Sequence, residues 1–202
     1  MDFFFVLTLA ATAAYLLNRQ QQRRRVALLA QQLQPYQIER FMETLMQGYL
    51  RAMGEQGDER RQQVLNLLAD DEARLCEQFE RFAAGFRRLP APQARVSRLP
   101  LGLPFATQLF PAASFDMGQA LAIHASGIAR AAGNQDGLAP RERAFVMTAE
   151  LLLMQHSCHW FCKSKTVASA RMLARHQTPH AQLVASVSPE TRRAYLALTG
   201  PV

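Results

Sequence analysis

The sequence predicts an all-α protein, in which a single N-terminal transmembrane helix precedes an irregular bundle of about four to five helices. Residues with high helix propensity, chiefly Ala, Leu, Gln, Arg, Glu and Met, dominate the periodic segments. No stretch alternates apolar and polar residues as a half-buried strand would. The chain has 202 residues, 49% of them hydrophobic, which suffices for one buried core. We therefore expect a single helical domain over residues 26–202.

The first element is an apolar helix with an arginine cluster behind it. Residues 3–17 read FFFVLTLAATAAYLL and contain no charge. At ~1.5 Å per residue they extend about 22 Å, less than the ~30 Å hydrocarbon core, so a span would require thinning of the bilayer or snorkelling by Arg19. We predict a membrane anchor over residues 1–25.

Two other interpretations of this segment compete with an anchor. A cleaved signal peptide would place positive charge before the apolar run, whereas here Asp2 precedes it and the arginines follow, although Ala11-Thr12-Ala13 resembles a cleavage site. An ordinary core helix or an interfacial helix is the third possibility. The position of the arginines favours the anchor.

The arginine cluster sets the expected orientation and location. By the positive-inside rule, the N-terminus lies outside and the bulk of the chain lies in the cytoplasm, as a single-pass protein of a bacterial-type inner membrane. Anionic lipid headgroups should attract each of these arginines by ~1 kcal/mol. The cluster consists of Arg19, Arg23, Arg24 and Arg25. Membrane lipid is thus one expected partner.

The cysteines agree with a cytoplasmic location. The chain has three, Cys76, Cys158 and Cys162, which is an odd number, and the last two are four residues apart in a helical segment where bridging geometry is poor. Unpaired thiols are typical of a reducing compartment.

The next two helices are predicted from apolar residues at helical spacing. The first covers residues 38–53 and is separated near Pro35 from a continuation of the anchor helix. The second covers residues 58–86, and the two should pack antiparallel. Five prolines then interrupt residues 89–112, which stay apolar, so we expect an extended or 3₁₀ connection lying across the core.

Three further helices complete the prediction. One covers residues 114–132 and ends at a Gly-Asn-Gln-Asp-Gly turn. Another begins at Pro140, runs to His176, and is apolar enough in its middle to be the central core helix. The last begins at Ser188, an expected N-cap.

The central helix carries a cluster of His and Cys residues that could bind a metal. Soft sulfur and imidazole ligands suit zinc, copper or haem iron, particularly if His124 or Cys76 came from a facing helix. One helix can direct only two or three such atoms at one point, and no Cys-x-x-Cys pair or His-Glu-x-x-His motif is present. We therefore predict no cofactor and favour a structural role for the cluster, whose members are His156, Cys158, His159 and Cys162.

A basic stretch follows this cluster. Residues 151–189 contain no Asp or Glu, and the cations Lys163, Lys165, Arg171 and Arg175 accumulate there. They could form an anion-binding surface for lipid headgroups, nucleic acid or an acidic partner. The simpler interpretation is that cations near a helix C-terminus complement its dipole. Although the net charge is +7, the arginines behind the anchor supply much of it, so nucleic-acid binding is not favoured.

No motif in the sequence specifies a reaction. The sequence lacks a Gly-rich phosphate loop, a Gly-x-Ser-x-Gly elbow and a Glu-x-x-His pair. We expect a membrane-anchored interaction or assembly protein without catalytic activity, on the cytoplasmic face, with a protein partner of unknown identity. A metal, haem or thiol-redox protein is the second hypothesis, and an anion or nucleic-acid binder is the third.

Overall fold

The computed structural model describes residues 2–201, and its fold is mostly helical, as predicted. The helices are α1 (Asp2–Leu33), α2 (Ile38–Gly54), α3 (Asp58–Arg87), α4 (Ala91–Ala94), α5 (Ala106–Leu109), α6 (Met117–Ala132), α7 (Pro140–Cys162), α8 (Lys165–His176), α9 (His180–Ser186) and α10 (Pro189–Thr199). A 3₁₀ turn, η1 (Pro111–Ala113), and two short strands, β1 (Arg95–Ser97) and β2 (Ser114–Asp116), complete the described part of the chain. The expected four to five helices thus underestimate the number of helical segments.

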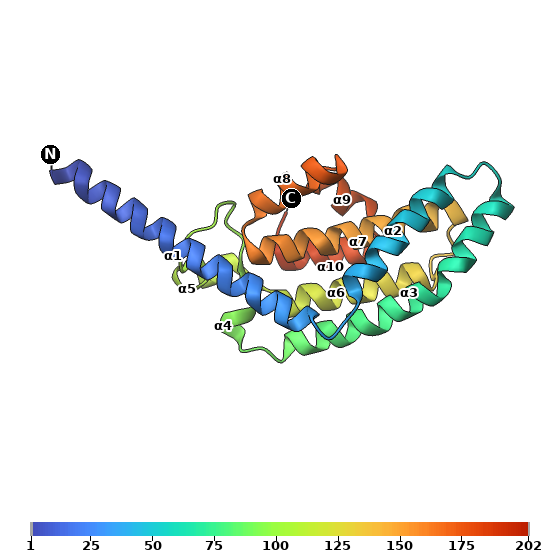
Figure 1. Cartoon of the computed structure of the whole chain (residues 1–202), viewed down its shortest axis with the longest axis horizontal. Coiled ribbons are helices and arrows are strands. Elements are labelled where there is room, and N and C mark those ends of the chain that lie inside the picture. The colour runs from blue at the N-terminus through green and yellow to red at the C-terminus, as the bar shows by residue number, and fades with distance from the viewer. Residues whose placement is uncertain (1, 202) are drawn as a thin grey trace.

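Helix α1 has two halves with different surroundings. Its first half projects away from the body of the protein, and its second half lies along the body (Figure 1). Between residues 2 and 201 no helix has both the length and the apolarity needed to cross a membrane, so the predicted transmembrane span is not supported. The physical reason is the polar sequence that begins at Asn18, which limits the uncharged run to about 22 Å.

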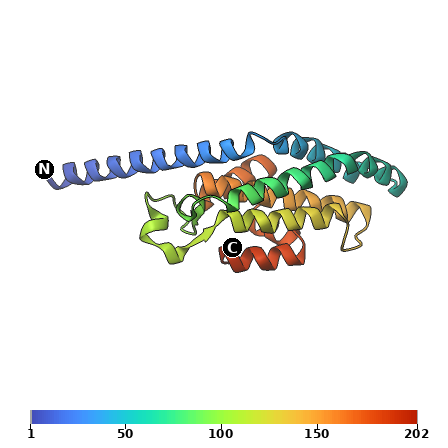
Figure 2. The same ribbon diagram turned by 90° about the horizontal axis from the view of Figure 1, so that it is seen from below.

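The body is built around a hairpin of α2 and α3, which pack antiparallel as predicted, and the two helices α6 and α7 (Figures 1 and 2). A buried polar contact joins three of these helices. Tyr49 of α2 donates a hydrogen bond of 2.6 Å to Glu72 of α3, whose other carboxylate oxygen pairs with Arg143 of α7. Burial raises the pKa of Tyr49, and the phenol therefore stays protonated.

Helix α7 is the central core helix, but it ends earlier than predicted. Residues 140–176 form two helices, because the backbone leaves helical geometry at Lys163 and Ser164 then caps α8. The Ser164 hydroxyl accepts a hydrogen bond from the backbone N–H of Val167, at 3.3 Å. The chain reverses direction here, so α8 packs back on α7.

The proline-rich connection was expected to be extended or 3₁₀ and to lie across the core, which is correct only in part. It ends in the 3₁₀ turn η1, but side chains such as Leu101 and Leu109 are exposed and do not cover the core. It contains the short helices α4 and α5 and the strand β1, which pairs antiparallel with β2, opposing Val96 to Phe115. The first three residues expected in the helix at 114–132 form β2 instead. At the other end of the chain, Ser188 caps α10 as predicted, and α9 is an additional short helix.

Candidate functional site

The projecting half of α1 exposes apolar side chains on every side. All residues from Phe3 to Leu17 are exposed, with Phe3 and Phe4 each 75% exposed. The interpretation of this segment as a core helix is therefore wrong. Transferring such side chains out of water is worth about 1.5–3 kcal/mol each, so covering the whole segment would release more than about 10 kcal/mol. A surface of this kind marks a site of contact with another molecule or a membrane.

Both threonine hydroxyls inside this segment bond to the helix itself. Thr8 donates its hydroxyl to the Phe4 carbonyl at 2.7 Å, and Thr12 donates to the Thr8 carbonyl at 2.8 Å. Backbone groups farther along α1 bond to one another within the helix, whereas the N–H groups of its first turn have no partner inside it. The two threonine hydroxyls therefore need no water as a hydrogen-bond partner.

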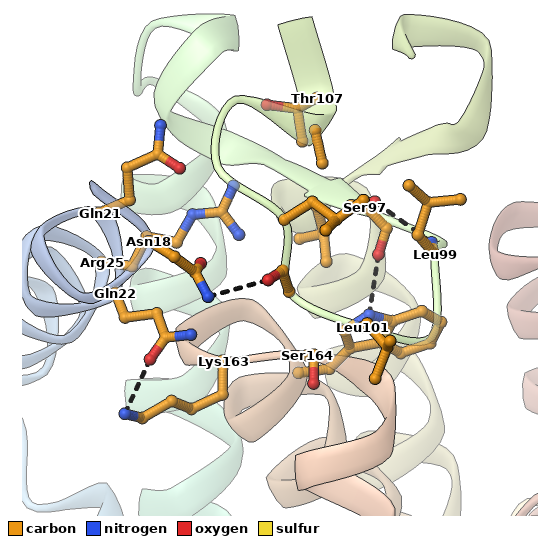
Figure 3. A pocket seen from close by; sticks show the side chains of 15 residues that line it. Asn18, Gln21, Gln22, Arg25, Ser97, Leu99, Leu101, Thr107, Lys163 and Ser164 are labelled. Carbon is orange, nitrogen blue, oxygen red and sulfur yellow. Dashed lines mark hydrogen bonds between the residues drawn. The ribbon is translucent and has the colours of Figure 1, made fainter. Parts of the chain in front are cut away.

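Polar residues attach α1 to the body directly after the apolar segment (Figure 3). The Asn18 amide donates to the Gly102 carbonyl at 2.8 Å. Gln21 accepts a hydrogen bond of 3.1 Å from the Phe105 N–H. Gln22 accepts from the Lys163 ammonium at 2.9 Å. Sequence analysis missed these roles because each partner is distant in the chain. A cleft between these side chains has a volume of about 30 Å³, which is enough for roughly one water molecule.

Arg25 differs from the other three arginines of the cluster. Its guanidinium donates to the carbonyls of Phe161 and Arg95, at 3.2 and 3.0 Å, and lies 5.6 Å from the centre of the Phe161 ring. Burial lowers its pKa. Arg25 therefore holds α1 on the body instead of facing lipid, whereas Arg19, Arg23 and Arg24 are exposed.

The basic residues at the end of α7 and along α8 also differ in their surroundings. Lys163 contacts Gln22, and the Lys165 ammonium lies 5.4 Å from the centre of the Trp160 ring. Arg171 and Arg175 are exposed along α8. The structure thus brings Lys163 next to the arginine-rich part of α1, although the four cations do not form one compact binding site.

The His and Cys cluster of α7 does not converge. His156 is buried against His180, with ring centres 3.9 Å apart, while His159 lies near Arg171, its Nδ1 being 3.3 Å from the guanidinium. The Cys158 thiol contacts Met154 Sδ at 3.8 Å. In the part of the chain that the structure describes, no group of three His, Cys, Asp or Glu side chains could hold a metal ion.

The thiols are also poorly suited to redox chemistry. Burial raises the pKa of Cys158 to about 12 and that of Cys162 to about 11, so both remain protonated at neutral pH. Protonated thiols are weak nucleophiles. Both cysteines pack as small apolar side chains of α7.

The buried histidines form a polar core between five helices. His124 of α6 bonds to Ser157 of α7 at 2.8 Å, His156 bonds to Ser169 of α8 at 3.1 Å, and His180 of α9 bonds to Tyr195 of α10 at 3.3 Å. Burial lowers the pKa values of the three histidines, to about 3 for His124, about 2 for His156 and about 4 for His180. They are neutral hydrogen-bonding groups at physiological pH.

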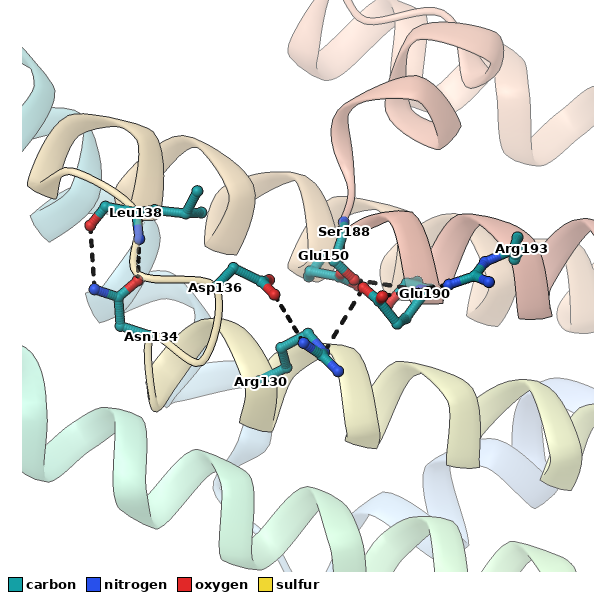
Figure 4. A network of polar contacts seen from close by, with 9 residues as sticks. Arg130, Asn134, Asp136, Leu138, Glu150, Ser188, Glu190 and Arg193 are labelled. Carbon is teal, nitrogen blue, oxygen red and sulfur yellow. Dashed lines mark hydrogen bonds and ion pairs between the residues drawn. The ribbon is translucent and has the colours of Figure 1, made fainter.

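Glu150 is a buried carboxyl group of α7, and among residues 2–201 no cation forms an ion pair with it. Its Oε1 accepts a hydrogen bond of 3.1 Å from the backbone N–H of Ser188, at the start of α10 (Figure 4). Burial raises its pKa. Beside it, Arg130 bridges Asp136 and Glu190, at 2.7 and 3.9 Å, so that this network joins the α6–α7 turn to α10.

An apolar groove lies on the body at α2, α7 and α9. Its volume is about 370 Å³, and the exposed side chains Leu50 and Phe145 line it, together with the methionines Met46 and Met53. Methionine-lined apolar grooves adapt well to protein partners because the thioether side chain is flexible.

No protein family, curated protein or solved structure matches this chain.

Proposed function

We propose that the protein is a membrane-anchored interaction protein, in which residues 3–17 of α1 insert into the lipid bilayer and the helical body is held at the cytoplasmic surface. The observation that carries this proposal is the exposure of apolar side chains around the full circumference of the projecting half of α1. A helix that docks on one protein surface needs only one apolar stripe. An apolar surface on all sides fits a solvent that surrounds the helix, namely lipid.

The internal bonding of Thr8 and Thr12 supports the same proposal. In hydrocarbon a hydroxyl without a partner is costly, and both hydroxyls bond to carbonyls one turn earlier in α1. The exposed residues Arg19, Arg23 and Arg24 follow immediately and would meet the headgroups on the cytoplasmic side.

Vesicle flotation of the full-length protein tests this proposal. Replacing Val6, Leu9 and Ala13 together by Asp introduces three charges, each of which costs roughly 2.5–3.5 kcal/mol near the middle of a bilayer. The wild-type protein should float with the vesicles, and the triple variant should stay in the dense fraction.

A matched control uses apolar residues that are equally exposed but lie on the body. Leu50→Asp with Leu67→Asp changes two side chains that are 62% and 81% exposed, and this variant should float like the wild type. If the triple variant of α1 floated as well as the wild type, insertion of α1 would be refuted.

The groove at α2, α7 and α9 supports the second part of the proposal, interaction with a protein. Phe145→Asp would place a charge in it without touching the buried core, because Phe145 is half exposed. We expect the wild-type protein, extracted from its own membranes in mild detergent, to migrate as a complex of defined stoichiometry that Phe145→Asp dissociates. If the wild-type protein and the Phe145→Asp variant migrated as the same species, the proposed protein interaction at the groove would be refuted.

A further inference from the structure

The proline-rich connection carries a second exposed apolar surface, formed by residues 99–110, which we name the apolar loop. Leu101 is 64% exposed and Leu109 is 66% exposed. The other large apolar side chains that the loop exposes are Leu103, Phe105 and Phe110. The loop therefore presents a local apolar patch that the core of the protein does not use.

The apolar loop lies next to the point where the apolar segment of α1 ends. Asn18 and Gln21 bond to Gly102 and Phe105 of the loop, as described above. Figures 1 and 2 show α5, which belongs to the loop, at the end of the body that faces the projecting half of α1. Asn18 and Gln21 lie about 1.5–6 Å along the helix axis beyond Leu17. The interfacial region on each side of a bilayer is roughly 5–8 Å thick, so the proposed insertion of α1 as far as Leu17 would put these contacts within it.

The backbone holds the loop in an unusual conformation. Phe105 has a φ of 57°, which is in the left-handed region that bulky residues rarely adopt. Its N–H is held by Gln21, and its carbonyl accepts hydrogen bonds of 2.9 Å from the N–H groups of Gln108 and Leu109. The surrounding bonds thus maintain a backbone conformation in which the Phe105 side chain is exposed instead of buried.

The stretches of chain that contact the loop carry basic residues and no Asp or Glu. Three stretches of chain meet there, residues 3–38, 81–115 and 151–189, and none of them contains any of the 16 acidic residues of the protein. Lys163 bonds to Gln22 of α1, and the hydroxyl of Thr166 donates to the Pro100 carbonyl at 2.7 Å, so the basic stretch adjoins the loop. An apolar patch with cations beside it suits the interface of a membrane that contains anionic lipid.

We infer that the apolar loop is a second membrane contact, which enters the headgroup region of the leaflet from which α1 emerges. Its apolar side chains reach the edge of the hydrocarbon, while the cations beside it, Lys163 with Arg19 and Arg23 of α1, meet lipid phosphates. The inference rests on the proposed insertion of α1. With two contacts, the body is fixed in orientation at the surface and cannot rotate freely about a single helix.

A fluorescent probe sensitive to polarity tests the inference on the full-length protein. The probe is attached to Leu109→Cys, or to Leu67→Cys as the matched control on the exposed surface of α3, and unsubstituted protein treated with the same reagent corrects for labelling of native thiols. Both positions are well exposed, so neither substitution disturbs the core. The vesicles contain phosphatidylcholine and phosphatidylglycerol, with a spin-labelled lipid as quencher.

The expected result is a blue-shifted emission at position 109 and quenching several-fold stronger than at position 67. If the protein floats with the vesicles but the probe at 109 behaves as it does at 67, the loop faces water or a protein, and the inference is overturned. If the protein does not float at all, the proposed insertion of α1 fails first. The two failures are therefore distinguishable.

Discussion

Two regions of this protein have apolar helical sequence and opposite surroundings. Residues 3–17 of α1 project from the body with every side chain exposed, whereas α7 is enclosed by α2, α6, α8 and α9. The hydrogen-bond partners of their polar side chains differ accordingly. In α7, Glu150, His156 and Ser157 find partners on other helices. In the projecting half of α1, the threonine hydroxyls bond only to their own helix.

This contrast shows that apolarity alone does not place a helix in a protein core. A core helix carries polar groups whose partners must arrive from elsewhere in the fold, and those partners fix its position. A helix that satisfies all its polar groups internally can enter lipid as an independent unit.

Acid should destabilise the body while sparing the membrane contact. The three buried histidines have lowered pKa values in the folded state, so the unfolded chain binds more protons as the pH falls below about 6.5, and stability is lost. Each histidine costs about 1.4 kcal/mol per pH unit below about pH 6.5, so the three histidines together should lower the free energy of unfolding by on the order of 5 kcal/mol between pH 7 and 5. The raised pKa values of the buried carboxyl groups of Glu72 and Glu150 act in the opposite direction and offset part of this loss.

Urea denaturation of the detergent-solubilised protein at several pH values measures this loss, and His124→Gln should make the pH dependence shallower. Vesicle flotation should persist at pH 5, because the sequence contains no Asp, Glu or His between Phe3 and Leu17. A free energy of unfolding that does not change with pH would contradict the account of the polar core.

Replacing a leucine by alanine should lower the stability of the body when the leucine belongs to α7, and should leave it unchanged when the leucine belongs to the projecting half of α1. Leu151 of α7 is fully buried, so Leu151→Ala should lower the free energy of unfolding by about 3 kcal/mol. Leu9 is 62% exposed, and Leu9→Ala should leave the stability of the body unchanged. Chemical denaturation of both variants in the same detergent gives the comparison, and equal losses would show that residues 3–17 pack on the body.

Close packing of α6 against α7 should make a substitution at one glycine, Gly127, destabilising. A methyl group on Gly127 of α6 would overlap the Glu150 carboxylate and the Thr191 hydroxyl, so Gly127→Ala should cost about 1–3 kcal/mol of unfolding free energy. Gly54, at the end of α2, has open space around its Cα. Gly54→Ala is thus the control, and thermal unfolding should find it within about 0.5 kcal/mol of the wild type.

The smallest expected effect concerns the charge of Glu150. Its raised pKa means that the folded state binds a proton that the unfolded state releases above about pH 4.5, so this group destabilises the fold as the pH rises. Glu150→Gln keeps the oxygen that accepts from Ser188 and removes the ionisation. The variant should be at least as stable as the wild type at pH 7, with a gain that shrinks toward pH 4. A large loss of stability at pH 7 would show that a charged carboxylate is required.

Periodic apolar sequence was sufficient to predict α2, α3 and most of α6 and α7. The break after Cys162 could not be predicted, because the sequence Lys163-Ser164-Lys165 contains neither Gly nor Pro, and the turn depends on packing of α8 against α7. The strands β1 and β2 were missed because each has only three residues, too few to show an alternating pattern.

Only those features of the candidate site that lie within one continuous stretch of sequence could be predicted. The apolar run and the arginines behind it are visible in the sequence, whereas the role of Arg25 depends on carbonyl groups of Phe161 and Arg95, far along the chain. The same is true of the contacts of Asn18 and Gln21 with the apolar loop. One signal was available: the absence of acidic residues from three separate stretches indicates a common surface.

The central claim is that residues 3–17 of α1 lie in lipid, and fractionation of cells that produce the full-length protein tests it most directly. After breakage, the membranes are collected and washed at alkaline pH, which removes proteins held by charge alone. The account predicts that the protein stays with the membranes after the wash. Recovery of the protein in the soluble fraction before any wash would contradict it.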